Sequence, residues 1–308
     1  MKYFQSIGLM LVSGLALLGS CTKENVMADS LQVTNQEVSI TCFEKSMVDI
    51  DEVVHSRANS PTSLKNAHSF NELEVALIPI DEEEDSGYVI RQDSTMADFG
   101  KVQLNVPAGT YHLIAVAANS KNLQKGRITI QNYTTVTFPN NQPTDMVYAY
   151  KEITVNTNKS KQNFDATLVR GISCFVLTSS ETTPADVAKE TITINGNCGT
   201  VFNPVTGKCA EKCEVSRTSI FDGSKFSDTY LHFAVYVVLG EDDVSDLQVD
   251  AQAYDKNDKV IRKLHFDNVH LEKAKATRYK GAIFSSTNTA NFTVSMPKME
   301  DSEYSKDF

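Results

Sequence analysis

The chain has 308 residues, of which 41% are hydrophobic and 22% are charged, a composition typical of a folded globular protein. Its formal charge of -10 at pH 7, without a concentrated basic stretch, argues against nucleic-acid binding, because phosphate recognition needs a basic face. A chain of this length favours two domains over one.

The first predicted element is a signal peptide at residues 1–20. Lys2 precedes an apolar run from Ile7 to Leu18, which is too short to span a bilayer comfortably. Cys21 follows Leu18, Gly19 and Ser20, a pattern similar to the bacterial lipobox, in which the cysteine thiol is acylated. We therefore expect Cys21 to hold the mature protein on a membrane surface outside the cytoplasm. The alternative is an ordinary signal peptide with a chance cysteine beside its cleavage site.

Polar segments and short strands alternate after Cys21. Residues 21–30 predict a tether, in which Lys23 and Glu24 resemble the short export signals of some Bacteroidetes lipoproteins or belong to a plain linker. Apolar and polar residues alternate over Glu37–Phe43, which predicts a half-buried strand. The polar stretch Asp49–Ser69 predicts an exposed loop.

Further strands complete a first set by residue 157. The alternating stretch Leu73–Leu77 predicts a strand, and Tyr88–Arg91 is expected to pair back onto it. Val102–Val106 and Tyr111–Asn119 flank Pro107 to Thr110, whose Pro-x-Gly step predicts a turn and hence a hairpin. The remaining strands of this set are expected at 128–138 and 146–155.

A second set of strands opens with Phe164–Arg170 and Gly171–Thr178. Thr183 as N-cap and Pro184 at the first helical position predict one short helix at Pro184–Glu190. Tyr230–Leu239 is almost continuously apolar and is expected to be a central buried strand. The other strands are expected at 191–195, 199–202, 214–217, 247–254, 259–266, 269–271, 278–284 and 292–296.

Many short strands with turn signals about every 8 to 12 residues indicate β-sandwiches. We therefore predict a mostly β chain with two sandwich domains, residues 31–157 and 158–297, and one short helix in the second. The boundary is expected in the polar stretch Thr157–Lys161. Residues 298–308 are predicted to form a polar tail.

Five cysteines remain besides Cys21. Cys42 and Cys174 lie in apolar strand patterns and are predicted to be buried thiols. Cys198, Cys209 and Cys213 surround a predicted turn, and they are candidates for a disulfide that closes this hairpin, since disulfides persist outside the cytoplasm. A zinc site is the alternative, and it is disfavoured because the group contains neither a histidine nor a CxxC pair.

No sequence motif for catalysis is present. The chain lacks the GxSxG, HExxH, GxxxxGK[ST] and GxGxxG patterns. Its six histidines are scattered, and the nearest pair, His265 and His270, has no third ligand at a fixed offset. We predict that the protein is not an enzyme and holds no metal or cofactor. A glycosidase stays open, because its paired carboxylates have no sequence motif.

Five segments together resemble the fimbrillin and fimbrial-anchor lipoproteins of Bacteroidales, which build type V pili. They are LLGSC at the lipobox, VPAGTYHLIAVAAN (106–119), LVRGISCFVLT (168–178), YLHFAVYVVL (230–239) and ATRYKGAIF (276–284). The resemblance covers nearly the whole mature chain. It implies two transthyretin-like, Greek-key β-sandwiches on the outer membrane that assemble with other fimbrial subunits by strand exchange and serve adhesion to surface ligands. The cysteine cluster departs from the family pattern.

The resemblance also implies roles for particular residues. An arginine-specific protease removes the first strand of such subunits, and Arg57, the first arginine of the chain, is the candidate site. An ordinary loop arginine is the alternative. Asp93-Ser94-Thr95 is similar to the short O-glycosylation acceptor of Bacteroidetes, which makes Ser94 a candidate.

A stalk subunit donates a strand from its C-terminal end, whereas an anchor keeps its lipid and only accepts one. The polar tail therefore favours an anchor or accessory subunit over a stalk subunit. The alternative function is a glycan-binding surface lipoprotein of a nutrient-capture system. The absence of tryptophan speaks against that alternative, because many such modules stack sugar rings on Trp.

Overall fold

The computed structural model describes residues 35–44, 62–64, 70–80, 87–120, 126–221, 230–285 and 289–296. The chain divides into two compact units, residues 1–33 and 34–308, and every described residue belongs to the second. Cys21, Arg57, the predicted tether and the predicted tail lie outside the described residues. Among the residues described, no helix is long and apolar enough to cross a membrane.

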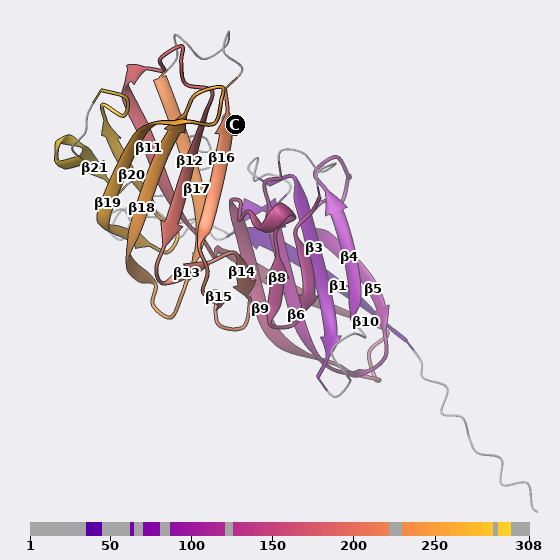
Figure 1. Ribbon diagram of the computed structural model, residues 1–308. Helices are drawn as coiled ribbons and strands as arrows, with labels where there is room; N and C mark the ends of the chain where they lie inside the picture. Colours follow the sequence, from indigo (N-terminus) through magenta and orange to yellow (C-terminus); the bar gives the residue numbers. More distant parts are fainter. Residues whose placement is uncertain are drawn as a thin grey trace, which may run out of the picture. The chain divides into compact units, whose positions relative to one another are not determined.

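Strands make up nearly all of the regular structure, which confirms the predicted mostly β fold with sandwich-like domains (Figure 1). The strands are β1 (Gln36–Glu44), β2 (Thr62–Ser63), β3 (Glu72–Pro79), β4 (Tyr88–Asp93), β5 (Lys101–Val106), β6 (Gly109–Ala118), β7 (Thr129–Asn132), β8 (Thr135–Thr137), β9 (Met146–Val155), β10 (Lys161–Arg170), β11 (Ser173–Thr182), β12 (Lys189–Asn195), β13 (Cys198–Gly199), β14 (Val201–Asn203), β15 (Lys208–Glu211), β16 (Val215–Ile220), β17 (Tyr230–Leu239), β18 (Val244–Tyr254), β19 (Val260–Glu272), β20 (Ala276–Gly281) and β21 (Thr293–Ser295). Two single-turn 3-10 helices, η4 (Pro139–Asn141) and η5 (Thr289–Asn291), lie in the described ranges.

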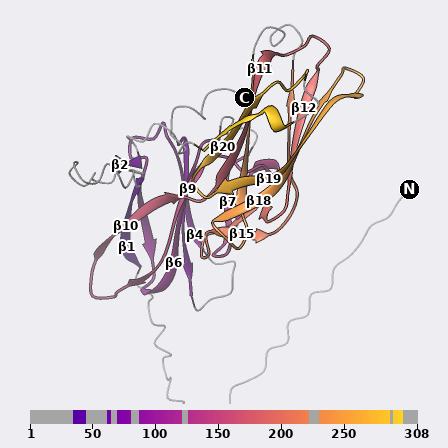
Figure 2. The same cartoon turned by 90° about the vertical axis from the view of Figure 1, so that its left-hand side faces the viewer.

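The first half is a sandwich of two layers around one apolar core. In one layer β1 lies between β10 on one side and β5 and β2 on the other, and the second layer has the order β9-β6-β3-β4. Strand β10 connects the layers, because Lys161–Leu168 run along β1 whereas Val169 and Arg170 pair with β9. Figure 2 shows β10 beside β1. Apolar side chains from both layers meet in one cluster that includes Val38, Leu77 and Leu113.

The second half is also a sandwich. A five-stranded sheet of order β13-β17-β11-β20-β21 packs on a four-stranded sheet of order β16-β12-β18-β19. The core between them contains Phe175 and Phe233 from the first sheet, and Ile192, Val249 and Phe266 from the second. Strand β17 lies between β13 and β11, as expected for the most apolar run of this half.

A third apolar cluster joins the two halves. It combines the outer face of the β6 and β3 layer with the outer face of β11 and β17. A short sheet of order β15-β14-β8-β7 packs against this third cluster. In this sheet, Phe202 of β14 pairs with Val136 of β8. Strands β3, β6, β11 and β17 are therefore buried on both faces, which explains their nearly continuous apolar sequences.

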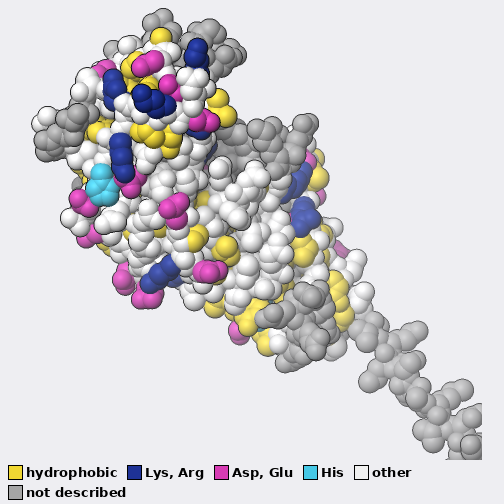
Figure 3. All heavy atoms as spheres, viewed as in Figure 1, with side chains coloured by type: hydrophobic (Ala, Val, Ile, Leu, Met, Phe, Trp, Pro, Cys, Tyr) yellow, Lys and Arg dark blue, Asp and Glu magenta, His cyan; other side chains and the backbone are white. Residues whose placement is uncertain are grey.

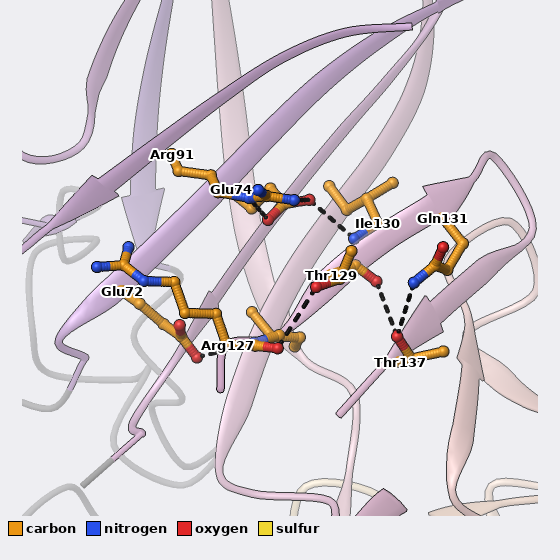
Figure 4. Close-up of polar contacts among 9 residues, drawn as sticks. Glu72, Glu74, Arg91, Arg127, Thr129, Ile130, Gln131 and Thr137 are labelled. Carbon is orange, nitrogen blue, oxygen red and sulfur yellow. Dashed lines mark hydrogen bonds and ion pairs between the residues drawn. The ribbon is translucent and has the colours of Figure 1, made fainter. Parts of the chain in front are cut away.

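Two buried glutamates attach the short sheet to the first sandwich. Glu72 and Glu74 of β3 point toward the start of β7 (Figure 4). Their carboxylates accept hydrogen bonds from the backbone N–H groups of Ile128, the residue before β7, at 3.3 Å and of Ile130, on β7, at 2.9 Å. Arg91 of the neighbouring β4 forms an ion pair with Glu74. Burial raises the pKa of the Glu72 carboxyl above its usual value. The carboxylates thus provide the acceptors that a neighbouring strand would otherwise supply to β7.

Three sequence-based expectations are wrong. The stretch at Pro184 forms a turn closed by a hydrogen bond from Val187 N–H to the Pro184 carbonyl, and β12 begins at Lys189, so the predicted helix at Pro184–Glu190 is absent. Strands β5 and β6 do not form a hairpin, because β5 pairs with β1 and β6 with β3 and β9. Strand β10, which was expected to open the second domain, pairs with strands of the first sandwich.

Candidate functional site

Strand β1 occupies a slot between two other strands of its layer. It runs parallel to β10, with Glu37–Glu44 beside Lys161–Leu168, and antiparallel to β5 on its other edge. Its last two residues, Phe43 and Glu44, pair with β2. Both backbone edges of β1 are therefore satisfied within the sandwich. Removing this strand would leave unpaired edges on β10 and β5 that face each other.

The side chains of β1 alternate as the sequence predicted. Val38 and Ile40 are 0% exposed and Cys42 is 1% exposed, and all three lie in the core of the first sandwich. Burial raises the pKa of the Cys42 thiol to about 12. Burying each aliphatic side chain of this size contributes about 1.5 to 3 kcal/mol. Strand β1 is thus held by three apolar pockets as well as by two ladders of hydrogen bonds.

In the sequence Arg57 falls between Glu44, the last residue of β1, and Thr62, the first residue of β2. A cut after Arg57 would therefore separate β1 from every later strand. Both Arg57 and Cys21 lie outside the described residues, so proteolysis and lipidation stay predictions.

Ser94 follows β4 in an exposed turn. The Asp93 carboxylate accepts a hydrogen bond from the Thr95 backbone N–H at 3.0 Å, and this interaction, together with that of the Thr95 hydroxyl, lowers the Asp93 pKa. The serine hydroxyl is reachable from solvent, and its glycosylation stays a prediction.

The three clustered cysteines lie near one another around the β14–β15 hairpin, which forms where the sequence predicted it. Cys198 is buried, Cys209 is half-buried and Cys213 is exposed, and each is a free thiol in this structure. Cys42 and Cys174 are buried as expected. The predicted disulfide is considered below.

The histidine pair of the sequence is held by separate carboxylates. His265 lies 3.0 Å from both Asp250 and Asp267, whose hydrogen bonds raise its pKa, and His270 lies 2.9 Å from Asp246. Across the described ranges, no group of three or more His, Cys, Asp or Glu side chains could hold a metal ion.

A groove of about 370 Å³ lies between β9 and β10, where these strands diverge. Its single acidic side chain is Asp165, and Lys151 crosses it to donate a hydrogen bond to the Asp165 carbonyl. The groove therefore lacks the paired acids that glycoside hydrolysis requires. On the face shown in Figure 3, acidic and basic side chains are interspersed, and no broad basic surface for nucleic acid is visible there.

Comparison with known proteins finds a family whose model matches part of this chain. Residues 79–203, from the end of β3 through β14, match the family model described as fimbrillin-A associated anchor proteins Mfa1 and Mfa2. This confirms the resemblance. The matching family consists of anchor proteins rather than enzymes. No curated protein matches the sequence.

One solved structure with a TM-score of 0.50 shares the fold at low sequence identity, and two others are reported beside it as similar structures. An adhesin candidate from Bacteroides thetaiotaomicron is 8% identical, with a TM-score of 0.50 over 88% of this chain and 100% of that one. The fimbrial anchor protein Mfa2 from Porphyromonas gingivalis is 12% identical, covering 86% of this chain and 98% of that one at a TM-score of 0.45. A fimbrial assembly protein from Parabacteroides distasonis is 14% identical, covering 85% of this chain and 99% of that one at a TM-score of 0.42.

Proposed function

We propose that the protein is a lipid-anchored subunit at the base or along the side of a surface fimbrium. The family match over residues 79–203 is the observation that carries this proposal. Acylated Cys21 holds the mature chain on the outer membrane, and the two sandwiches extend from it as a structural element. Other fimbrial subunits are its partners, and adhesion is the function of the assembled fibre.

The place of β1 supports assembly by strand donation. A neighbouring subunit's extended segment with alternating apolar residues would pair with the edges of β10 and β5 and fill the pockets of Val38, Ile40 and Cys42. In a link of the fibre, cleavage after Arg57 opens this slot. In an anchor, β1 and the lipid both stay in place.

The role in the fimbrium is tested by immunoprecipitating the protein from detergent-solubilised outer membrane. Fimbrial subunits are expected to co-purify with it, and Cys21→Ser is expected to move the protein out of the membrane fraction. Cys209→Ser, which changes a cysteine outside the lipobox, is the matched control and should leave the protein in the membrane. Precipitation of the intact protein without any fimbrial subunit would contradict the proposal.

Strand donation is tested on purified protein digested with an arginine-specific protease. We expect a new N-terminus at Ala58, with the β1 fragment still bound because both of its edges are paired. After the fragment is removed in mild denaturant, a fluorescent peptide of residues 35–44 should rebind. The same peptide with Ile40→Asp should bind at least about 100-fold more weakly, since a carboxylate would enter a buried apolar pocket.

Equal binding of the two peptides would contradict the proposal that the site between β10 and β5 selects a strand by its alternating apolar side chains. A folded protein that resists cleavage near residue 57 would exclude the role as a processed link and leave the anchor role.

A further inference from the structure

The three clustered cysteines do not face the same way. Cys198 lies on β13 with its side chain in the core of the second sandwich. Cys209 lies on β15 and packs against the cluster that joins the two halves. Cys213 follows β15 by two residues and is exposed. Nearness in sequence alone therefore does not decide which thiols can pair.

Cys198 and Cys213 are direct neighbours across the chain. The Cys213 backbone N–H donates to the Cys198 carbonyl at 2.9 Å, and Cys198 Sγ lies 3.9 Å from the Cys213 carbonyl oxygen. Cys213 lies just beyond β15 and shares this one backbone hydrogen bond with Cys198, a contact whose bond lengths place the two Cα atoms roughly 5 to 6 Å apart, close to the spacing of hydrogen-bonded strand neighbours. That separation is within the range of about 4.4 to 6.8 Å that a disulfide bridges.

Cys209 lies on the other side of β13. A Cβ atom placed on Gly199 would lie 3.2 Å from Cys209 Cβ, so Cys209 faces the side of β13 toward which residue 199 points. Successive side chains of a strand point to opposite faces, so the Cys198 side chain and the position of a side chain at residue 199 lie on opposite faces of β13. The Cys198 and Cys209 thiols are still close enough to interact electrostatically, so it is the backbone contact between Cys198 and Cys213 that selects this pair. The separation of Cys209 and Cys213 along the chain also bears on pairing. Extended backbone from Cys209 to Glu211 already spans about 6.6 Å, near the upper end of the Cα separation that a disulfide bridges, and Cys213 lies two residues beyond Glu211.

We propose that Cys198 and Cys213 form an intramolecular disulfide in the exported protein, and that Cys209 stays a free thiol. The location outside the cytoplasm rests on the proposed function, whereas the choice of partners rests on the geometry alone. The oxidant is a small-molecule or protein disulfide. Two cysteine thiols lose two electrons to it, it is reduced to two thiols, and no net proton is released.

The exposed Cys213 thiolate attacks the incoming disulfide first, which forms a mixed disulfide and expels one thiol. The Cys198 thiolate then attacks the Cys213 sulfur and expels the second. Burial raises the pKa of the Cys198 thiol to about 12, so its thiolate is rare at neutral pH. Ring closure is therefore the slow step and is expected to become about tenfold faster per pH unit between pH 7 and 9.

The bond would secure the connection between the halves. Strand β13 pairs with β17 of the second sandwich, while β14 and β15 belong to the short sheet that reaches β8 of the first (Figure 1). A link between Cys198 and Cys213 ties the two ends of this β-hairpin segment to the edge of the second sandwich. Loss of this disulfide is expected to lower the melting temperature by several degrees. The bond closes a loop whose two ends lie 15 residues apart, and this restricts the unfolded chain.

Trypsin separates the three cysteines, because Lys189, Lys208, Lys212 and Arg217 place them in peptides 190–208, 209–212 and 213–217. The protein is isolated from cells with free thiols blocked by N-ethylmaleimide, digested without reductant and measured by mass spectrometry. A second sample of the full mature chain is reduced, reoxidised with glutathione disulfide and treated alike. We expect peptide 190–208 linked to 213–217, and peptide 209–212 carrying N-ethylmaleimide.

Cys209→Ser is expected to leave the link intact, and Cys213→Ser to abolish it. A bond between 190–208 and 209–212, or between 209–212 and 213–217, would overturn the pairing. So would three blocked thiols after reoxidation. If the link forms in the reoxidised sample while the cell-derived protein has only free thiols, the pairing is supported and the proposed export is contradicted.

Discussion

Replacing Arg170 with methionine is expected to destabilise the protein by about 3 to 5 kcal/mol, because it leaves the Asp145 carboxylate buried without its main partner. The guanidinium of Arg170 donates two hydrogen bonds of 2.8 Å to the two oxygens of Asp145, and both residues are buried. This pair lies where β10 ends and the chain crosses to the second half. Urea titration of the unfolding free energy is the measurement.

The matched control is Lys161→Met, which removes an exposed ion pair on the same strand. Lys161 lies 2.9 Å from Glu37, and both side chains are more than one third exposed, so its loss should change stability by less than about 1 kcal/mol. The double variant Arg170→Met with Asp145→Leu should recover much of the lost stability, since apolar replacements of a buried pair are often neutral. A double variant as unstable as Arg170→Met alone would contradict this explanation.

Replacing Glu190 with methionine is expected to stabilise the protein by about 3 kcal/mol at pH 7. Glu190 is 0% exposed and lies on β12, on the same face as Ile192 and Ile194, inside the second sandwich. Neither of its carboxyl oxygens has a hydrogen-bond partner among the residues described. Burial raises the pKa of this carboxyl from 4.5 to about 8.

The direction in which the stability contribution of Glu190 changes with pH follows from the number of protons bound by the folded and unfolded states. Between about pH 4.5 and pH 8 the folded protein keeps Glu190 protonated while the unfolded chain releases the proton, so the unfolded state binds fewer protons. The contribution of Glu190 to stability therefore falls by about 1.4 kcal/mol per pH unit in this window. Glu190→Gln should remove this slope and still leave an unsatisfied polar group, so its gain at pH 7 should be smaller than that of Glu190→Met.

Thermal unfolding at pH 5 and pH 8 measures this effect. The melting temperature of the unmodified protein should fall more between these values than that of Glu190→Gln. Glu214→Gln changes an exposed glutamate of the same half and is the control that should follow the unmodified protein. Identical pH dependence in Glu190→Gln and the unmodified chain would show that the carboxyl is ionised in the folded state.

The burial of two carboxylates on β3 could not be predicted from the sequence pattern. The alternation of Leu73, Val75 and Leu77 correctly predicted the face of β3 that enters the first core. Glu72 and Glu74 alternate with these residues, so a strand with one solvent face would expose them, yet both are buried. Besides the side chains of Ser120 and Arg91, their hydrogen-bond donors include the backbone groups of Ile128 and Ile130, 56 residues further along the chain. A local pattern contains no information about donors at that distance.

The sequence by itself determined the strand-rich fold, because period-two alternation acts over a few neighbouring positions. Its five motifs carried the resemblance to fimbrial anchors. Only the tertiary structure decided that β5 pairs with β1 instead of β6, that β10 belongs to the first sandwich, and that the Cys213 backbone N–H bonds to the Cys198 carbonyl. These outcomes depend on which distant strands bury one another's faces. That choice is made by the free energy of the whole core rather than by any local segment.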